Sequence, residues 1–256
     1  MTMKKHSGKG NKLTVEMSKT HESFVNAIRR MIIEEVPTLA IEDVEIKENS
    51  SALYDEMLAL RLGLLPIKTD LKTYELKNKC ACAGEGCARC ELVLLLKSTK
   101  KGILPASDMQ SKDPKCTPVH GDMPVVFLLP KQKVELQATA ILGTGKQHAK
   151  WSPGLAWHQN KSTITVNQNS KKLEEFKSKY PAQIFDKSGK IKKDFIVEEN
   201  LVDAVDGICD DIIKVEYDPN TFLLNIESWG QLSTSEIMKQ AADMLIGKCE
   251  QMEAML

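Results

Sequence analysis

The sequence predicts an α+β fold in which both ends of the chain have a similar layout and a β-rich block lies between them. The chain begins with a strand pattern and then a helix pattern, and it ends with strand patterns and then a helix pattern. Short apolar runs separated by turn residues fill the middle. With 256 residues, of which 42% are hydrophobic, the chain can form one large domain or two modest ones. The layout allows both ends to form one domain with the middle inserted.

The N-terminal part of the chain predicts two strands and two helices. Apolar and polar residues alternate over 12–19, which predicts a strand. The pattern over 21–35 predicts a helix that stops before Pro37. Its apolar residues cover so much of its circumference that we expect burial on more than one face. A second strand is predicted over 38–47 and a second helix over 54–62.

The middle of the chain predicts mainly strands and loops. We expect 74–79 and 91–98 to be the two arms of a hairpin. The later middle predicts a loop over 100–124, strands over 125–129 and 134–142, a loop over 143–153 and a strand over 162–166. The segment 171–193 is rich in lysine and poor in large apolar residues, so it predicts an insertion with at most a short helix.

The C-terminal part predicts a hairpin and a helix. Asp218-Pro219-Asn220 is typical of a turn, so the apolar runs over 212–217 and 222–227 are expected to pair around it. Ser233 or Thr234 can cap the helix that comes next.

Four cysteines occur in the loop 80–90 with the spacing C-x-C-x₄-C-x₂-C, namely Cys80, Cys82, Cys87 and Cys90. This spacing brings four thiols within reach of one tetrahedral ion, and a closed shell of four thiolates leaves no position for a substrate. We therefore expect one structural zinc ion that holds the loop. Iron, an iron–sulfur occupant, and the absence of any metal are the alternatives. An odd total of seven cysteines also fits metal binding in a reducing compartment better than a disulfide framework.

The composition argues against several classes of function. Thirty-five basic and 35 acidic residues balance, whereas proteins that mainly grip nucleic acid carry a basic surplus. The apolar runs are too short to cross a bilayer, and we expect no signal peptide, so a soluble, cytoplasmic protein is predicted. The segment Gly143-Thr144-Gly145-Lys146 is not a phosphate-binding loop, because Ala140 stands where that motif requires its first glycine. We assign no catalytic residues.

Two helices favour an obligate partner chain. The first is apolar around much of its surface, and the last keeps its apolar stripe up to Leu256, where chain ends normally fray. A second polypeptide that covers these surfaces explains both features. The expected apolar contacts are Phe24, Ala27, Ile28 and Met31 on the first helix, and Ile237, Ala241, Met244, Leu245 and Met252 on the last.

Three motifs carry a family resemblance. They are Asn26-Ala27-Ile28-Arg29-Arg30 with the nearby Glu35-Val36-Pro37, the segment from Asp55 to Pro66, and the segment from Gly145 to Pro153. Together they resemble the D-subunit family of archaeal DNA-directed RNA polymerases, which includes the eukaryotic third-largest subunit and the N-terminal domain of the bacterial alpha subunit. The cysteine loop is similar to the zinc loop of the eukaryotic subunit. The resemblance runs from about residue 13 to the C-terminal helix.

The resemblance implies an architecture and partners. Residues 1–43 plus 212–256 would form an alpha-subunit-like dimerisation domain, and 44–211 would form an inserted, mostly-β domain with a zinc-loop hairpin. The chain would be a non-catalytic assembly subunit that forms a heterodimer with subunit L. This pair would be the platform for the two large catalytic subunits and subunits N and P, with DNA contacted only indirectly and no membrane involved.

The resemblance also implies roles for polar residues. Asn26, Arg29 and Arg30 would face the partner or a large subunit, and Lys150, Trp151, Ser152 and Pro153 would lie on an assembly surface. Some archaeal members carry iron–sulfur ligands after the Trp-Ser-Pro segment, but 161–207 contains no cysteine here. We therefore expect a remnant insertion without an iron–sulfur cluster. The rival hypothesis is a stand-alone zinc or iron–sulfur redox or binding protein.

Overall fold

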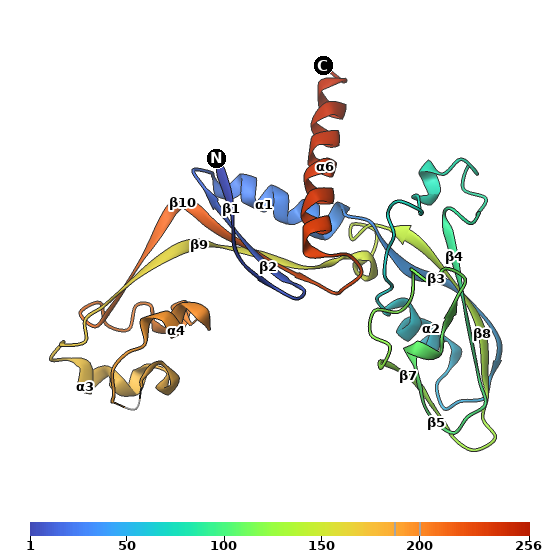
Figure 1. Cartoon of the computed structure of the whole chain (residues 1–256), viewed down its shortest axis with the longest axis horizontal. Helices are drawn as coiled ribbons and strands as arrows, with labels where there is room; N and C mark the ends of the chain where they lie inside the picture. Colours follow the sequence, from blue (N-terminus) through green and yellow to red (C-terminus); the bar gives the residue numbers. More distant parts are fainter. Residues whose placement is uncertain (187, 200) are drawn as a thin grey trace. The chain divides into compact units, whose positions relative to one another are not determined.

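The computed structural model describes residues 1–186, 188–199 and 201–256, and the chain divides into two compact units (Figure 1). Unit 1 comprises Met1–Lys4, Glu16–Glu22 and His158–Leu223, and unit 2 comprises Lys5–Val15, Ser23–Trp157 and Leu224–Leu256. These bounds differ from the boundaries predicted at 43/44 and 211/212. The dimerisation and inserted domains therefore stay a prediction.

The structure is mixed α and β, as predicted, and its described residues form three sheets. The first has the order β1-β2-β10-β9 and comprises β1 (Thr2–Lys9), β2 (Lys12–Ser18), β10 (Ile213–Ser228) and β9 (Gly154–Val166). The second has the order β3-β8-β4-β6, is antiparallel, and comprises β3 (Thr38–Asn49), β8 (Val134–Gly143), β4 (Glu91–Ser98) and β6 (Gln110–Ser111). The third is the antiparallel pair of β5 (Gly102–Pro105) and β7 (Pro124–Leu128).

Six α-helices and several short turns complete the described part of the chain. The helices are α1 (Glu22–Arg30), α2 (Asp55–Gly63), α3 (Leu173–Phe176), α4 (Lys193–Glu198), α5 (Val202–Val205) and α6 (Thr234–Glu253). A π-helical turn, η1 (Met31–Glu35), continues α1. Short 3₁₀ turns are η2 (Lys77–Lys79), η3 (Ala106–Asp108), η4 (Ala149–Trp151), η5 (Lys177–Lys179) and η6 (Ala182–Ile184). No helix in the described residues is both long and apolar enough to span a membrane.

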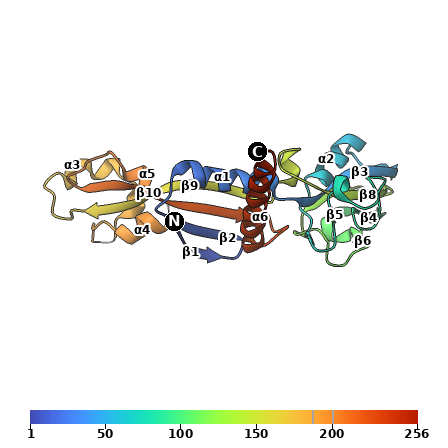
Figure 2. The same cartoon turned by 90° about the horizontal axis from the view of Figure 1, so that it is seen from above.

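The core of unit 2 lies on one face of the β3-β8-β4 sheet, whose strands lie together in Figure 2. Alternate residues of each strand point to this face, so Leu94 lies opposite Ala138 and Leu96 opposite Leu136, all of them buried. Leu58 and Leu62, one turn apart on α2, join the same cluster. Burial of such side chains stabilises the fold by about 25 cal/mol per Å² of apolar surface removed from water.

Most predicted elements of the N-terminal part and the middle are confirmed within a few residues. The strands predicted over 12–19, 38–47, 91–98, 125–129 and 134–142 are β2, β3, β4, β7 and β8, and the helices predicted over 21–35 and 54–62 are α1 with η1 and α2. The strand predicted over 162–166 is the end of the much longer β9. β1 was not predicted, and the loop expected over 100–124 contains β5, η3 and β6.

The predicted hairpin of 74–79 with 91–98 is wrong. β4 pairs with β8 and β6, and 74–79 forms no strand. Tyr74 is buried and its hydroxyl donates to Asp113 Oδ2 at 3.3 Å, which holds the segment against the core instead. One backbone bond, from the Glu75 amide to Arg89 O at 2.9 Å, still joins this segment to the loop before β4.

The predicted hairpin around Asp218-Pro219-Asn220 is also wrong, because β10 is one continuous strand of 16 residues. The Asn160 side chain donates to Asp218 O at 3.0 Å, and the Thr20 amide donates to Asn220 O at 3.2 Å. These partners satisfy the backbone carbonyls on both sides of Pro219 and hold it extended. The turn signal is therefore overridden by tertiary contacts.

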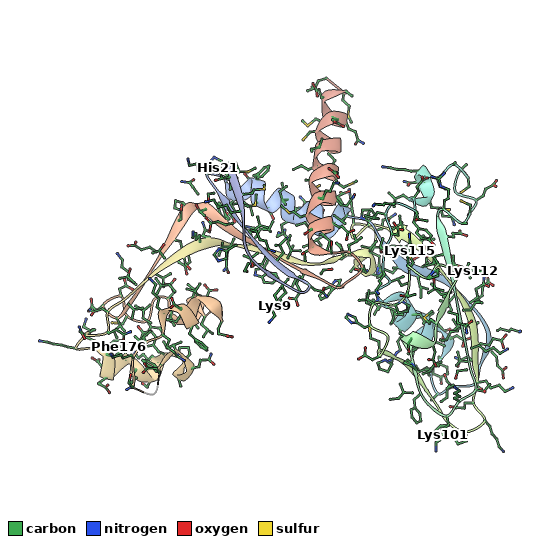
Figure 3. The ribbon with its side chains drawn as sticks, in the orientation of Figure 1. Lys9, His21, Lys101, Lys112, Lys115 and Phe176 are labelled. Atoms are coloured by element: carbon green, nitrogen blue, oxygen red, sulfur yellow. The ribbon has the colours of Figure 1, made fainter. Side chains whose placement is uncertain are left out.

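The described residues of the lysine-rich segment 171–193 form a short α-helix, as predicted, and they also contribute to a small core. α3, η5 and η6 lie in this segment and belong to unit 1, where Phe176 is labelled in Figure 3. The core cluster of unit 1 comprises Ile164, Tyr180, Ile184, Ile191, Ile196, Val202, Val205, Ile212 and Ile213. Isoleucines spaced among the lysines supply this core, and lysine side chains cover aromatic rings, as where Lys192 Nζ lies 4.3 Å from the Phe195 ring centroid. Within the remnant insertion expected over 161–207, positions 187 and 200 lie outside the described residues.

The small core of unit 1 predicts a local effect of truncating a side chain. Ile184 is fully buried there, so Ile184→Ala should destabilise this region by about 2–5 kcal/mol through lost burial and the cavity left behind. Hydrogen–deuterium exchange should then become faster across 164–213 and stay unchanged in the β3-β8-β4 sheet. Val197→Ala, at a half-exposed position of α4, is the control. Equal exchange rates in both variants would show that this segment has no cooperative core.

Candidate metal centre and candidate partner surfaces

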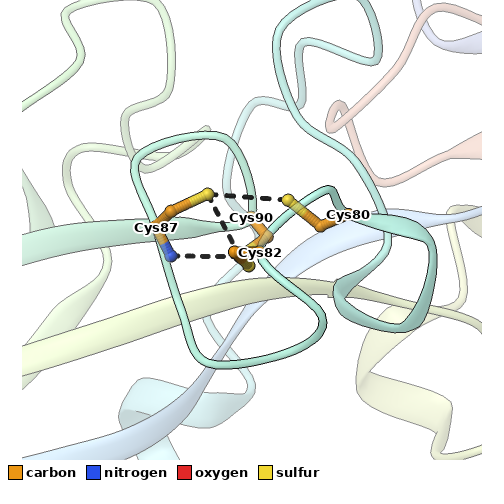
Figure 4. Close-up of side chains that lie close together, drawn as sticks. All are labelled: Cys80, Cys82, Cys87 and Cys90. Carbon is orange, nitrogen blue, oxygen red and sulfur yellow. Dashed lines mark hydrogen bonds between the residues drawn. The ribbon is translucent and has the colours of Figure 1, made fainter.

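Four cysteine side chains meet in the loop before β4, as their spacing predicts (Figure 4). Their Sγ atoms all lie within 4.8 Å of one another. The Cys80–Cys87, Cys82–Cys90 and Cys87–Cys90 sulfur pairs are 3.5, 3.6 and 3.8 Å apart. Four thiolates about 2.3 Å from one tetrahedral zinc ion would place their sulfurs about 3.8 Å apart. The residues present therefore fit one tetrahedral metal ion.

Two tight turns bring these thiols together. The Ala83 amide donates to Cys80 O at 3.0 Å, and the Cys90 amide donates to Cys87 O at 3.0 Å. Gly86, between the two turns, has a φ of +99°, and a Cβ atom there would lie 2.6 Å from the carboxylate oxygens of Glu91. A side chain would thus meet both an unfavourable backbone conformation and a carboxylate, so this position requires glycine.

The thiols differ in their electrostatic surroundings. Burial raises the pKa of the Cys90 thiol to about 12, because the thiolate would lose its hydration. Hydrogen bonds from the backbone amides of Gly86 and Gly84 lower the pKa of the Cys82 thiol to about 6. A cation at the centre favours the thiolate form of every ligand, so metal binding would release protons.

The cysteine cluster is partly buried, and a metal ion bound by all four thiolates would have no position left for a substrate. Cys80 and Cys90 are buried, whereas Cys82 and Cys87 are half-buried. Lys77 pairs with Glu91 at 2.8 Å, and Arg89 pairs with Glu75, so ion pairs attach both ends of the loop to its neighbours. Among the residues that the structure describes, no other group of three or more His, Cys, Asp or Glu side chains could hold a metal ion. Four sulfur ligands leave no open coordination position, so a metal here would crosslink the loop.

The predicted partner residues of α1 and η1 fall into two groups. Ile28 is only 3% exposed, so the chain itself covers it, and we place it in the core rather than in an interface. Phe24, Asn26, Ala27, Arg29 and Met31 are half-buried, and Arg30 is exposed. Asn26 Oδ1 accepts hydrogen bonds from Arg29 at 2.9 and 3.0 Å, and Arg30 pairs with Glu34 at 3.0 Å. These contacts hold the two arginines on the helix surface, and their role toward a partner stays a prediction.

α6 begins against η1 and ends uncovered. The Ser233 hydroxyl caps the helix as predicted and forms a capping box with Glu236. The first turns pack on η1, where Ile237 and Ala241 are fully buried, so these two residues also belong to the chain's own core. The same stripe continues through half-buried Met244 and Leu245 to Met252, which is 67% exposed. Figure 1 shows the C-terminal half of α6 extending away from the other elements of unit 2.

The predicted assembly surface at Lys150–Pro153 is largely internal. Trp151 is 6% exposed, its Nε1 donates to Ile141 O at 3.2 Å, and its carbonyl accepts from the Thr38 hydroxyl at 2.6 Å. Lys150 Nζ lies over the same ring, donates to Ile41 O at 2.9 Å and pairs with Glu42. Pro153 is buried, and the Ser152 hydroxyl donates to Gly154 O at 3.0 Å. These side chains join β3 to β8, and their contact with other subunits stays a prediction.

One exposed apolar surface was not predicted from the sequence. Ile103 and Phe127 on the β5–β7 pair are 64% and 51% exposed, and Leu129, directly after β7, is 50% exposed. The signal that could have found it is the run Val125 to Leu129, whose unbroken apolar character leaves no polar residue for the solvent side of a strand.

The cluster predicts a specific loss of metal. Cys87→Ser should lower the zinc content of the purified chain well below one ion, because three thiolates close this site poorly and metal binding is coupled to local folding. Cys249→Ser is the matched control, since Cys249 is exposed on α6. Elemental analysis by mass spectrometry measures both variants. Equal zinc in the two would remove the assignment of Cys87 as a ligand.

Known proteins similar to this chain share most of its length. Residues 14–249 match the family model of the RNA polymerase Rpb3/Rpb11 dimerisation domain. The chain is 36% identical over 246 residues to the DNA-directed RNA polymerase subunit Rpo3 of Methanosarcina acetivorans. This alignment covers 94% of this chain and 92% of the relative. It is 32% identical to the subunit Rpo3 of Archaeoglobus fulgidus, over 91% of this chain and 89% of the relative. It is also 32% identical to the subunit Rpo3 of Pyrococcus furiosus, over 90% of this chain and 87% of the relative. The chain therefore belongs to the family of the RNA polymerase Rpb3/Rpb11 dimerisation domain, which confirms the archaeal RNA polymerase resemblance of its motifs.

Proposed function

We propose that this chain is a non-catalytic assembly subunit of an archaeal-type multisubunit DNA-directed RNA polymerase. The observation that carries the proposal is the family match over residues 14–249, together with relatives named Rpo3 that align over about nine-tenths of both chains. The alternative of a stand-alone redox or binding protein gains no support from these relatives. Nucleotide transfer would belong to the whole complex, and the chain's contribution would be to hold other subunits in place.

The partner in our proposal is subunit L, and the contact is the uncovered stripe of α6 with the half-buried side of α1 and η1. Met244, Leu245 and Met252 continue the stripe that packs on η1, so a second chain laid along α6 would extend a contact that already exists. Each Å² of apolar surface that such a chain removes from water contributes about 25 cal/mol. Arg29 and Arg30 directly precede η1 and can pair with carboxylates of a partner.

The heterodimer would form the platform for the two large catalytic subunits and subunits N and P. Residues 1–43 with 212–256 would supply the dimerisation domain, and 44–211 the inserted domain. A structural zinc ion on Cys80, Cys82, Cys87 and Cys90 would fix the loop before β4 in one conformation. The support for zinc is the set of four sulfurs at distances that suit tetrahedral coordination.

Charged substitutions on α6 test the heterodimer. Leu245→Glu with Met252→Glu places two charges on the uncovered stripe, so co-purification with co-expressed subunit L should be lost. Ile246→Glu is the matched control, because Ile246 is 57% exposed and one helical position beyond Leu245, toward the opposite side of α6. The control should co-purify like the unaltered chain. A stable heterodimer of the double variant would contradict the proposed role of α6.

A further inference from the structure

The β5–β7 ribbon presents an apolar outer face. Its strands pair antiparallel, with Ile103 opposite Phe127 and Leu104 opposite Val126. Leu104 and Val126 are 3% and 4% exposed and face the core, so the alternation of a strand turns Ile103 and Phe127 outward. An antiparallel ribbon with one face on the core normally carries polar residues on the other. Two large apolar side chains in directly opposed outer positions therefore indicate a surface that another molecule covers.

The turn after β7 extends this face. The Leu129 amide donates to the Gln132 side chain at 2.7 Å, and the Gln132 amide donates back to Leu129 O at 3.1 Å. These reciprocal bonds hold Leu129, which is 50% exposed, at the end of the ribbon. The apolar surface is thus held in place before any partner arrives, which lowers the entropic cost of binding.

A groove runs between this face and the residues around α2. Its volume is about 360 Å³, and it is lined by Leu53, Arg61, Ile103, Phe127 and Leu129 among others. Among the described lining residues, only Arg61 has a charged or polar side chain, and its guanidinium donates to Pro124 O at 2.6 Å. A small-molecule site needs several convergent polar groups to orient its ligand. The lining instead suits large apolar side chains of a polypeptide.

Positive charges border the apolar face. Lys100 and Lys101 directly precede β5, and Lys131 lies in the turn after β7; all three are exposed. Figure 3 labels Lys101 at the end of the ribbon. The described groove lining contains no carboxylate, and Asp55, at the start of α2, accepts a hydrogen bond from Asn49 at 2.7 Å. Charge complementarity therefore favours a partner segment with Asp or Glu beside its apolar residues.

A second copy of this chain fits poorly. A two-fold symmetric contact would bring together two copies of a surface that is bordered by Lys100, Lys101 and Lys131 and whose described groove lining offers no carboxylate, so the like charges would repel. We propose that the outer face of the β5–β7 ribbon and its groove dock a segment of another polymerase subunit in which large apolar side chains are flanked by acidic residues. This inference rests on the proposed function and concerns a surface separate from the α6 stripe.

Binding between purified subunits tests the ribbon. The heterodimer with subunit L is prepared with the unaltered chain and with Ile103→Ser plus Phe127→Ser, and its affinity for each other purified polymerase subunit is measured by biolayer interferometry. One of these subunits should bind the double variant at least about tenfold more weakly, because a tenfold loss corresponds to about 1.4 kcal/mol. Binding of subunit L should be unchanged. Val197→Ser, at an exposed apolar position in unit 1, is the control.

Charge reversal gives a second readout that keeps the apolar face. Lys101→Glu with Lys131→Glu should weaken the same interaction at about 50 mM salt, and this difference should shrink at about 1 M salt because the charges are then screened. Unchanged binding of every subunit to both double variants would overturn the inference, as would stronger binding after charge reversal. Loss of self-association by the Ile103→Ser, Phe127→Ser variant, with all subunits still bound, would identify a second copy as the occupant and also overturn it. Failure of the unaltered chain to bind any polymerase subunit would instead overturn the proposed function.

Discussion

The packing of α6 on the π-helical turn η1 determines where the chain presents its uncovered apolar helix. η1 closes with a hydrogen bond from the Val36 amide to Met31 O at 3.2 Å, and Pro37 ends the helix directly afterwards. The start of α6 lies against this turn, and Lys248 pairs with Glu35 at 2.6 Å further along. Because the first turns of α6 contact η1, the direction of its second half depends on this turn.

A third segment supports the same turn. A π-helical turn changes the usual hydrogen-bond pattern of a helix and leaves carbonyl groups for other partners. The Lys146 amide donates to Glu34 O at 2.9 Å, and a Cβ atom on Gly145 would lie only 1.9 Å from Ile33 O. Glycine is therefore required for this backbone approach. The Gly145-Lys146 pair, which the sequence presents as a family motif, has a structural explanation here: it completes the end of the first helix.

Local features were predictable from the sequence, and distant pairings were not. The cap of α6, predicted at Ser233 or Thr234, and the four-cysteine loop depend on residues close in the chain, so the local sequence was enough to predict both. The pairing of β4 with β8 joins residues more than 30 positions apart, and a neighbouring segment was wrongly preferred as the partner of β4. Pro219 shows the same limit, because contacts from Asn160 and Thr20 decide its conformation. Ile28 was correctly identified as apolar and buried, but the pattern did not reveal that the chain itself covers it.

Periodicity gives the direction of a side chain but not what covers it, and α6 shows the difference within one stripe. Ile237 and Met252 belong to the same face, yet they are 0% and 67% exposed. The helix has 20 residues and is therefore about 30 Å long, whereas the five-residue turn η1 can cover only its first part. Apolar surface left in water forgoes about 25 cal/mol per Å². The partner chain proposed above would remove this part of the stripe from water, which η1 cannot do because it packs on the first turns of α6.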